Sequence, residues 1–169
     1  PEGRNQVVGW LLLAVLAAEP SGGLDAVSAK FLGTAYVVSP LGEGKGKDPD
    51  PLYRPDAVDC LTFVEQAIAL HLAPAEKDVV PVLTQIRYEG EEPDFEQRNH
   101  VMEAQWLPSN VKKGFLKDIT REIGGAQTVK VKKRLDDVAW KSKTGAALGL
   151  APQSQKHGDF AWDIIPAEV

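Results

Sequence analysis

The sequence predicts one globular domain that contains both helices and strands. Its 169 residues, 43% of them hydrophobic, are enough to bury one sizeable core and favour one domain over two. Apolar residues at helical spacing follow Cys60 and indicate a helix. The alternation of Val129 and Val131 with Lys130 and Lys132 is typical of a half-exposed strand.

Two helical patterns open the chain. Residues 7–18 form the only long apolar run, with Arg4 before it, and the run is too short to span a bilayer. A signal-peptide core is one interpretation. However, a second helical pattern at residues 24–32 follows closely, which favours two packed helices of one domain. We therefore expect residues 7–18 to form a buried helix and keep the signal segment as the alternative.

A long irregular segment precedes the clearest helix. Residues 33–59 hold four prolines and several glycines, which exclude a continuous helix or a central strand. Such a long loop in a compact domain is usually functional. Residues 60–72 carry the helical pattern, and Pro74 ends it. Cys60 therefore lies in the first turn of the expected helix.

The rest of the chain carries weaker patterns. Residues 79–88 indicate a short helix or strand, and an acidic turn follows at residues 91–94. Residues 111–134 are basic and contain the half-exposed strand. Residues 141–169 are rich in Gly, Pro and Ala, so we expect them to be mostly irregular.

Charge and composition argue against several function classes. Nineteen basic and 24 acidic residues leave a net charge of −5, which argues against nucleic acid or an anionic membrane as the main partner. The Gly-rich residues 42–47 lack the flanking strand and helix of a phosphate-binding loop, so we reject nucleotide binding. The basic residues between 112 and 133 are expected to form a solvated face; attraction of peptide carboxylates is the alternative.

Cys60 is the candidate nucleophile. The backbone N–H groups and the positive dipole end at a helix N-terminus stabilise a thiolate over a thiol. The alternative is a small buried side chain, which is the commoner role of a lone cysteine. Asp59 would oppose a thiolate unless its carboxylate caps the helix, and we expect it to cap.

A cysteine nucleophile usually needs a histidine to accept its proton, and the chain has three. His71 lies eleven residues along the same helix, about 16 Å from Cys60 at the helical rise per residue, so it cannot reach the sulfur. His157, which Gly158 follows, is expected to be a turn residue. No two of the three histidines share the spacing of metal ligands, so no metal site is expected.

His100 is the remaining candidate base. It follows Arg98 and Asn99 and precedes Trp106, a mixture that suits a polar pocket with an aromatic wall. A surface-loop histidine is an equally good interpretation of the same residues. The residues alone leave both alternatives open.

Five motifs resemble one bacterial family in order and spacing. They are Phe31-Leu32-Gly33-Thr34-Ala35-Tyr36, Ser39-Pro40-Leu41-Gly42-Glu43-Gly44, Asp59-Cys60-Leu61-Thr62-Phe63-Val64-Glu65, Arg98-Asn99-His100, and Trp106 with Asn110. Over nearly the whole chain they resemble the N-acetylmuramoyl-L-alanine amidase-like branch of the NlpC-type, papain-like cysteine hydrolases. The resemblance implies a single amidase-like domain over residues 1–169. It also implies an α+β fold in which the cysteine-bearing helix packs on an antiparallel sheet.

The resemblance also implies an activity and a site. The activity is hydrolysis of an amide bond in peptidoglycan or a muropeptide, either the N-acetylmuramoyl-L-alanine bond or a stem-peptide bond. Cys60 matches the nucleophile, which would form a thioester intermediate while nearby backbone N–H groups stabilise the oxyanion. The positions expected to bind substrate are Tyr36, Asp59, Arg98, Asn99 and Trp106.

The C-terminal end departs from the family pattern. In that pattern, strands with a Gly-Asp turn and a later histidine follow the position of residues 164–169, where this chain stops. We therefore expect a domain that lacks its C-terminal strands. The general base is then either that later histidine or His100, which follows the cysteine by 40 positions in the order that papain-like enzymes share.

The resemblance also implies a partner and a location for the protein. The expected partner is peptidoglycan or a muropeptide, in the periplasm or elsewhere in the cell envelope. No cofactor, metal ion or transmembrane segment is expected. The alternative to a hydrolase is a non-catalytic module that binds the cell wall, or an inactive fragment of such a hydrolase.

Overall fold

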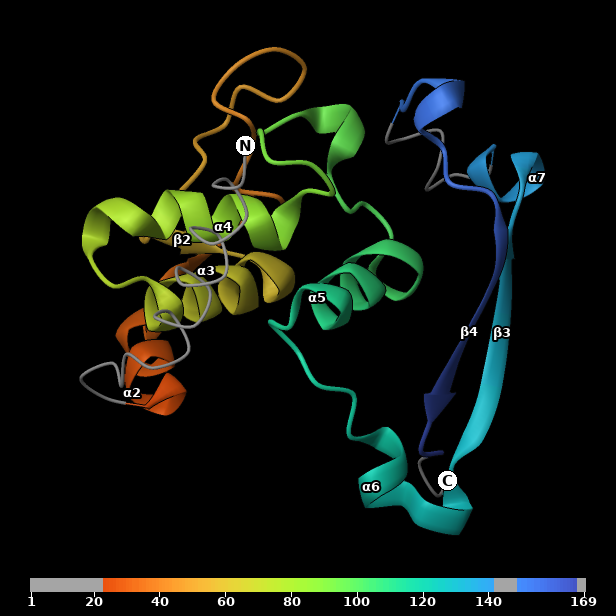
Figure 1. Ribbon diagram of the computed structural model, residues 1–169. Coiled ribbons are helices and arrows are strands. Elements are labelled where there is room, and N and C mark those ends of the chain that lie inside the picture. The colour runs from red at the N-terminus through yellow and green to blue at the C-terminus, as the bar shows by residue number, and fades with distance from the viewer. Residues whose placement is uncertain (1–22, 142–148, 167–169) are drawn as a thin grey trace, which may run out of the picture. The chain divides into compact units, whose positions relative to one another are not determined.

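The chain forms two compact units, which divide after Phe95 (Figure 1). The structure, a computed structural model, describes residues 23–141 and 149–166. The expected α+β mixture of helices and strands is confirmed. The helix expected at residues 7–18 lies outside the described residues. The single domain, and the packing of the cysteine-bearing helix on an antiparallel sheet, stay predictions.

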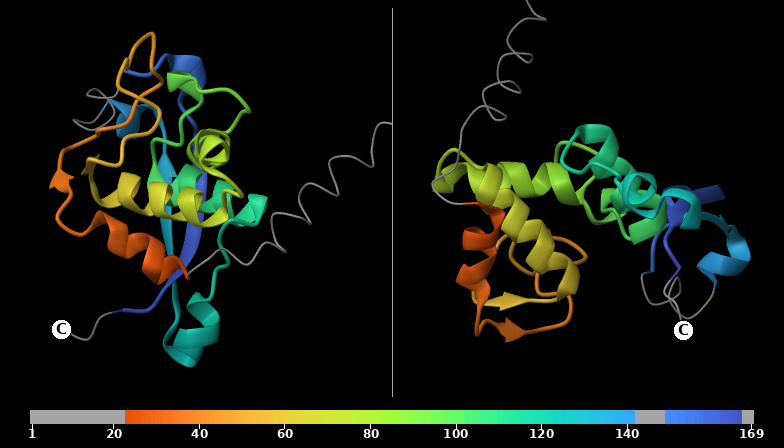
Figure 2. Two further views of the ribbon diagram at one scale, coloured as in Figure 1. Left: turned by 90° about the vertical axis from the view of Figure 1, so that its left-hand side faces the viewer. Right: turned by 90° about the horizontal axis from the view of Figure 1, so that it is seen from below.

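The first unit is built from helices and one pair of short strands. Its described elements are α2 (Leu24–Ser28), η1 (Ala29–Phe31), β1 (Ala35–Tyr36), β2 (Ala57–Val58), α3 (Cys60–Leu72), η2 (Glu76–Asp78) and α4 (Val79–Arg87). The helices expected at residues 24–32 and 60–72 are confirmed, and residues 79–87 of the stretch 79–88 are helical rather than extended. β1 and β2 pair in parallel, and β2 leads directly into α3 (Figure 2).

α3 is the central helix of the first unit, and it packs against both α2 and α4. Ala69 of α3 and Ile86 of α4 are fully buried, and Phe31 meets Phe63 edge to face with ring centroids 5.6 Å apart. Burial of this apolar surface is the main force that holds the helices together. No helix in the described parts of the chain is long and apolar enough to cross a membrane.

The segment between β1 and β2 is irregular, as expected, but part of it is buried. Leu41 is fully buried, and the Gly42 and Glu43 N–H groups donate to the carbonyls of Pro51 (3.1 Å) and Asp48 (2.9 Å). A Cβ at Gly42 would lie 2.6 Å from the Asp48 carbonyl oxygen, so this close approach requires glycine. Hydrogen bonds within the loop therefore fix the part of it around Gly42 and Glu43.

The second unit combines short helices with a two-stranded sheet. After η3 (Phe95–Gln97), its described elements are the π-helical turn η4 (Met102–Trp106), α5 (Leu107–Lys113), α6 (Thr120–Gly124), η5 (Gly125–Gln127), β3 (Val129–Leu135), α7 (Asp137–Trp140), η6 (Pro152–Ser154) and β4 (Gly158–Ile164). β3 and β4 run antiparallel along their full length (Figure 2). The strand expected around residues 129–132 is confirmed.

The expectation of a mostly irregular tail is wrong for residues 158–164. This stretch forms β4, in which Phe160 and Trp162 lie opposite Lys133 and Val131 of β3. Its pairing partner is about thirty residues away in sequence, and cross-strand pairing decides strand formation more than local composition does. The Gly and Pro content of the tail therefore misled the prediction.

Candidate active site

Cys60 is the first residue of α3, and its side chain is exposed. An exposed position does not fit the alternative role of a small buried side chain. The first four N–H groups of a helix have no intrahelical partners and point toward its N-terminal end. The thiol of Cys60 therefore stands at the end of the helix where negative charge is stabilised.

Asp59 caps α3, as the sequence predicts. Its Oδ1 accepts hydrogen bonds from the N–H groups of Leu61 (3.1 Å) and Thr62 (2.8 Å) and from the Thr62 hydroxyl (2.7 Å). The Asp59 N–H donates in return to Thr62 Oγ1 at 2.8 Å, which completes a capping box. The Phe63 N–H donates to the Asp59 carbonyl at 2.9 Å.

One N–H group in the first turn of α3 has no acceptor in this cap. The N–H groups of Leu61, Thr62 and Phe63 all donate to Asp59, whereas the Cys60 N–H has no hydrogen-bond partner among the described residues. The donor nearest to the thiol is therefore available to an acceptor from solution. A backbone N–H without a protein partner is the kind of donor that can stabilise an oxyanion.

The hydrogen bonds to Asp59 keep its carboxylate charged. Its Oδ2 accepts a further bond from the Ser39 N–H at 3.0 Å. Burial, the largest single influence, raises the pKa of Asp59, but the hydrogen bonds from Thr62, Ser39 and Leu61 together lower it by more. The pKa of Asp59 therefore lies below its usual value, and the cap stays ionised at neutral pH.

The segment around Tyr36 lies beside the helix start. Tyr36 is opposite Val58 in the β1–β2 pair, and its side chain is 68% exposed. The Val37 N–H donates to the Val58 carbonyl at 3.0 Å. Ser39 adopts a positive φ of 51°, which is uncommon for a residue other than glycine and recurs at functional sites. The structure thus brings Tyr36 and Asp59 to the region of Cys60, while their roles toward substrate stay predictions.

The other predicted site residues lie in the second unit. Arg98 and His100 are half-buried, and the His100 N–H donates to the Arg98 carbonyl at 2.9 Å. Asn99 is buried, and its Nδ2 has no hydrogen-bond partner among the described residues. The two units are described separately, so the pairing of His100 with Cys60 stays a prediction.

Trp106 is buried inside the second unit. It ends the π-helical turn, where its N–H donates to the Val101 carbonyl at 3.2 Å and its carbonyl accepts from Asn110 Nδ2 at 2.8 Å. π-helical turns are rare and recur at functional sites. The observed surroundings of Trp106 are those of a packing residue, and an aromatic wall for a substrate stays a prediction.

The two remaining histidines differ in their surroundings. His71 is half-buried on α3 and is the only histidine of the first unit. His157 is exposed before β4, and its ring nitrogens face the Gln155 carbonyl (2.8 Å) and an Asp137 carboxylate oxygen (3.0 Å). Among the described residues, no group of three or more His, Cys, Asp or Glu side chains is arranged to hold a metal ion.

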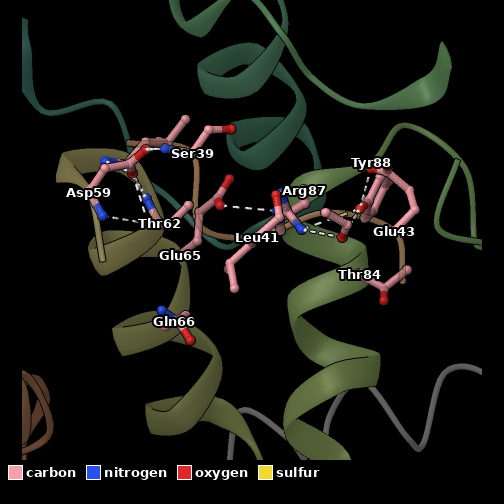
Figure 3. A network of polar contacts seen from close by, with 12 residues as sticks. Ser39, Leu41, Glu43, Asp59, Thr62, Glu65, Gln66, Thr84, Arg87 and Tyr88 are labelled. Carbon is pink, nitrogen blue, oxygen red and sulfur yellow. Dashed lines mark hydrogen bonds and ion pairs between the residues drawn. The ribbon is translucent and has the colours of Figure 1, made fainter. Parts of the chain in front are cut away.

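A buried polar network connects α3, α4 and the loop at Leu41 and Gly42 (Figure 3). The sequence did not predict this network. Arg87 Nε lies 3.2 Å from Glu65 Oε2, and both side chains are only 4% exposed. The two Nη atoms of Arg87 donate to the carbonyls of Leu41 (3.0 Å) and Gly42 (3.2 Å). α3, α4 and the buried loop therefore meet at one guanidinium.

A second bond ties the same loop to the end of α4. The hydroxyl of Tyr88, a fully buried side chain, donates to Glu43 Oε1 at 2.8 Å (Figure 3). The sequence held one signal for the network, because Glu65 and Arg87 are charged residues within helices whose neighbouring residues are largely apolar. A charged residue at a buried helical position requires a partner, but the pattern does not say which one.

Comparisons with known proteins come from a family model and from solved structures. The model of the AmiA-like family, described as N-acetylmuramoyl-L-alanine amidase-like, matches residues 26–162. A Legionella pneumophila protein of the family of unknown function DUF1460 is 26% identical, with a TM-score of 0.73. The match covers 85% of this chain and 56% of that one. Among curated proteins, no sequence matches the chain.

Two Bacteroides structures are similar as well. A Bacteroides fragilis protein, provisionally described as a xylanase, is 26% identical with a TM-score of 0.55, over 78% of this chain and 62% of its own. An N-acetylmuramoyl-L-alanine amidase from Bacteroides uniformis is 24% identical with a TM-score of 0.58, over 80% and 62%, and supports the fold alone. The chain thus spans about three fifths of the length of these proteins.

Proposed function

The chain belongs to the N-acetylmuramoyl-L-alanine amidase-like family, and from this premise we propose that it is a cysteine-dependent amide hydrolase of peptidoglycan or muropeptides. The family match confirms the resemblance that the five motifs predicted. One observation supports the proposal most strongly: the single cysteine is exposed at the first position of the central helix, beside an unoccupied backbone N–H.

The proposed reaction begins at the sulfur of Cys60. The thiolate attacks the carbonyl carbon of the amide, and the Cys60 N–H donates to the oxyanion that forms. The C–N bond then breaks, the amine leaves with a proton, and a thioester remains on the sulfur. Water hydrolyses the thioester to a carboxylate and returns the thiol. For the muramoyl-alanine bond, the group held on sulfur is the muramoyl half.

A general base must take the thiol proton, and His71 does not suit this role. It lies eleven residues from Cys60 on the same helix, about 16 Å away at 1.5 Å per residue. It is the only histidine of the first unit, so the base has to come from elsewhere. We propose His100, from the Arg98-Asn99-His100 motif that the family resemblance carries.

The binding-site residues come from the motifs that carry the family resemblance. We propose Tyr36, Arg98, Asn99 and Trp106 as residues that shape the binding site, and Asp59 as the residue that fixes the helix start. The papain-like arrangement, in which α3 packs on an antiparallel sheet, belongs to the same proposal. A cell-wall substrate implies an extracytoplasmic location, in the periplasm or elsewhere in the envelope.

The test is cleavage of purified muropeptides, followed by mass spectrometry of the products. Cys60→Ala is expected to lower turnover by at least about a hundredfold, since no nucleophile remains. Cys60 is exposed, so the variant should keep the unfolding midpoint of the wild-type chain. Turnover retained by Cys60→Ala would refute the cysteine mechanism.

His100→Ala tests the proposed base separately. It is expected to lower turnover by about a hundredfold, the usual contribution of one general base. Full activity of this variant would move the base to another group while leaving the nucleophile in place. The control is His71→Ala, which is expected to retain wild-type turnover.

A non-catalytic cell-wall-binding module is the second candidate function. It is favoured by one observation, namely that the first unit offers Cys60 no histidine within reach. A binder would leave every muropeptide mass unchanged and would still be retained by peptidoglycan sacculi. Such a result with the wild-type chain would replace the hydrolase by the binder.

A further inference from the structure

We propose that Arg87 is a positioning residue for the site at Cys60: it locks the segment from Tyr36 to Gly42 beside the start of α3. This inference rests on the proposed function, because it assigns a role toward the same site. Arg87 lies at the C-terminal end of α4, and its contacts run to the loop and to α3 rather than to Cys60 itself.

The segment from Tyr36 to Gly42 is held at several points along its length. At its N-terminal end, Tyr36 pairs with Val58, and in the middle the Ser39 N–H donates to the Asp59 carboxylate at 3.0 Å. At its C-terminal end, Arg87 holds the carbonyls of Leu41 and Gly42 (Figure 3). The first two attachments involve residues beside Cys60. At the Gly42 end, Arg87 holds the carbonyls while the Gly42 N–H donates to the Pro51 carbonyl at 3.1 Å.

The Arg87 guanidinium is suited to hold the C-terminal end of the segment. A guanidinium is planar and presents its donors in a fixed fork, so one side chain can hold two successive carbonyls in a defined direction. Glu65 fixes the orientation of that fork through Arg87 Nε, and both charged groups are almost fully buried. Tyr88 accepts a further bond from Nη1 at 3.3 Å. The Leu41 carbonyl is thus held two residues after Ser39.

The attachment to Arg87 opposes backbone strain at Ser39. Ser39 has a positive φ of 51° although it is not glycine, and the residue after it is Pro40. Strained backbone of this kind persists only when the surrounding structure holds it in place. Asp59 supplies the hold on the Ser39 N–H, and Arg87 supplies it two residues later. Release of the loop carbonyls should therefore let Ser39 relax and move Tyr36.

The experiment compares two conservative variants, Arg87→Lys and Glu65→Gln. A lysine keeps the positive charge next to Glu65 but lacks the fork that reaches both carbonyls. A glutamine removes the charge of the pair but still offers an oxygen to Arg87, so the bonds from Arg87 to the loop remain. Both variants are expected to lower the unfolding midpoint, and only Arg87→Lys is expected to loosen the loop.

Amide hydrogen exchange gives a readout that does not need activity. Exchange at the Ser39 and Gly42 amides should accelerate about tenfold or more in Arg87→Lys and stay within about twofold in Glu65→Gln, since one charge-assisted bond is worth about a tenfold change. Unchanged exchange in Arg87→Lys, or an equal change in both variants, would overturn the proposal.

Kinetics on muropeptides give the second readout. KM should rise about five- to tenfold in Arg87→Lys with kcat within about twofold, which indicates lost binding rather than lost chemistry. A fall in kcat with unchanged KM would overturn the positioning role. If the wild-type chain turns over no muropeptide, the proposed function fails, and the exchange comparison still decides the role of Arg87 in holding the loop.

Discussion

One arrangement of charges from each unit of the chain shows two different uses of charge. In the first unit, Glu65 and Arg87 form an ion pair that is almost completely buried, and the guanidinium also holds two loop carbonyls. In the second unit, the carboxylate of Asp163 on β4 accepts from Arg121 and pairs with Lys130, whose side chains are 71% and 50% exposed. The first arrangement lies in the core, whereas in the second the two basic side chains face solvent around an Asp163 side chain that is 11% exposed.

The difference shows which charges the fold depends on. An exposed pair exchanges water for protein partners at little net gain, and salt screens it. A buried pair must stay complete, because removal of one partner leaves a charge that is cut off from water. The basic residues of the second unit therefore form a solvated face, as the sequence predicts. The buried pair of the first unit instead contacts the loop that leads to the candidate site.

The largest effect is expected for Arg87→Met, which breaks the buried pair. It takes the guanidinium away from the buried Glu65 carboxylate and from two loop carbonyls, so the free energy of unfolding should fall by about 3–5 kcal/mol. Chemical denaturation of the purified chain measures the change. The double variant Glu65→Leu/Arg87→Met should recover part of the loss, because it also removes the buried carboxylate. A loss below about 1 kcal/mol would mean that this buried pair contributes no more to stability than an exposed ion pair does.

A smaller effect is expected at the helix cap. Asp59→Ala removes the acceptor for the N–H groups of Leu61, Thr62 and Ser39 and should lower the free energy of unfolding by about 1 kcal/mol. Thr62→Val provides a partial comparison, since it removes the reciprocal half of the capping box. An unchanged stability of Asp59→Ala would mean that the cap does not hold the helix start.

Acid titration sharpens the prediction for Asp59. Because its pKa in the folded chain is lowered, its contribution to stability is present above the unfolded pKa of about 4 and is lost as the pH falls through the folded value. Asp59→Asn should therefore weaken the loss of stability below about pH 4 relative to the wild type. Denaturation curves at pH 7 and pH 3 measure it, and identical pH dependence in both proteins would contradict it.

The smallest effect is expected for Arg121→Gln in the second unit. Its guanidinium pairs with Asp163 at the surface, so its removal should change stability by only a small fraction of the effect at Arg87. The difference should shrink further in high salt. A large, salt-insensitive loss at Arg121 would remove the contrast between the two units.

Local patterns were enough to predict the helix and its cap. The apolar spacing after Cys60, with Asp59 before it and Pro74 after it, predicted the bounds of α3 and the capping role. Capping and helix termination act over three or four residues, so the sequence carries them directly. The same pattern placed Cys60 in the first turn of the helix, but it left open whether the side chain is exposed, because exposure depends on tertiary packing.

Contacts between distant residues were beyond such patterns. β4 was missed because its partner strand lies elsewhere in the chain, and Arg87 was missed because the carbonyls that it holds lie 45 and 46 residues away. A buried charge shows in a sequence as an unusual residue on an apolar face, but its partner depends on tertiary packing. The same limit applies to the pairing of Cys60 with His100.

The most direct test of the central claim is the intact mass of the chain, quenched in acid during turnover of a muropeptide. The account predicts an adduct on Cys60 whose mass equals the acyl half of the cleaved bond, which also identifies that bond. Cys60→Ala should show no adduct and no cleavage products. Cleavage by Cys60→Ala, without an adduct on the wild-type chain, would contradict the account.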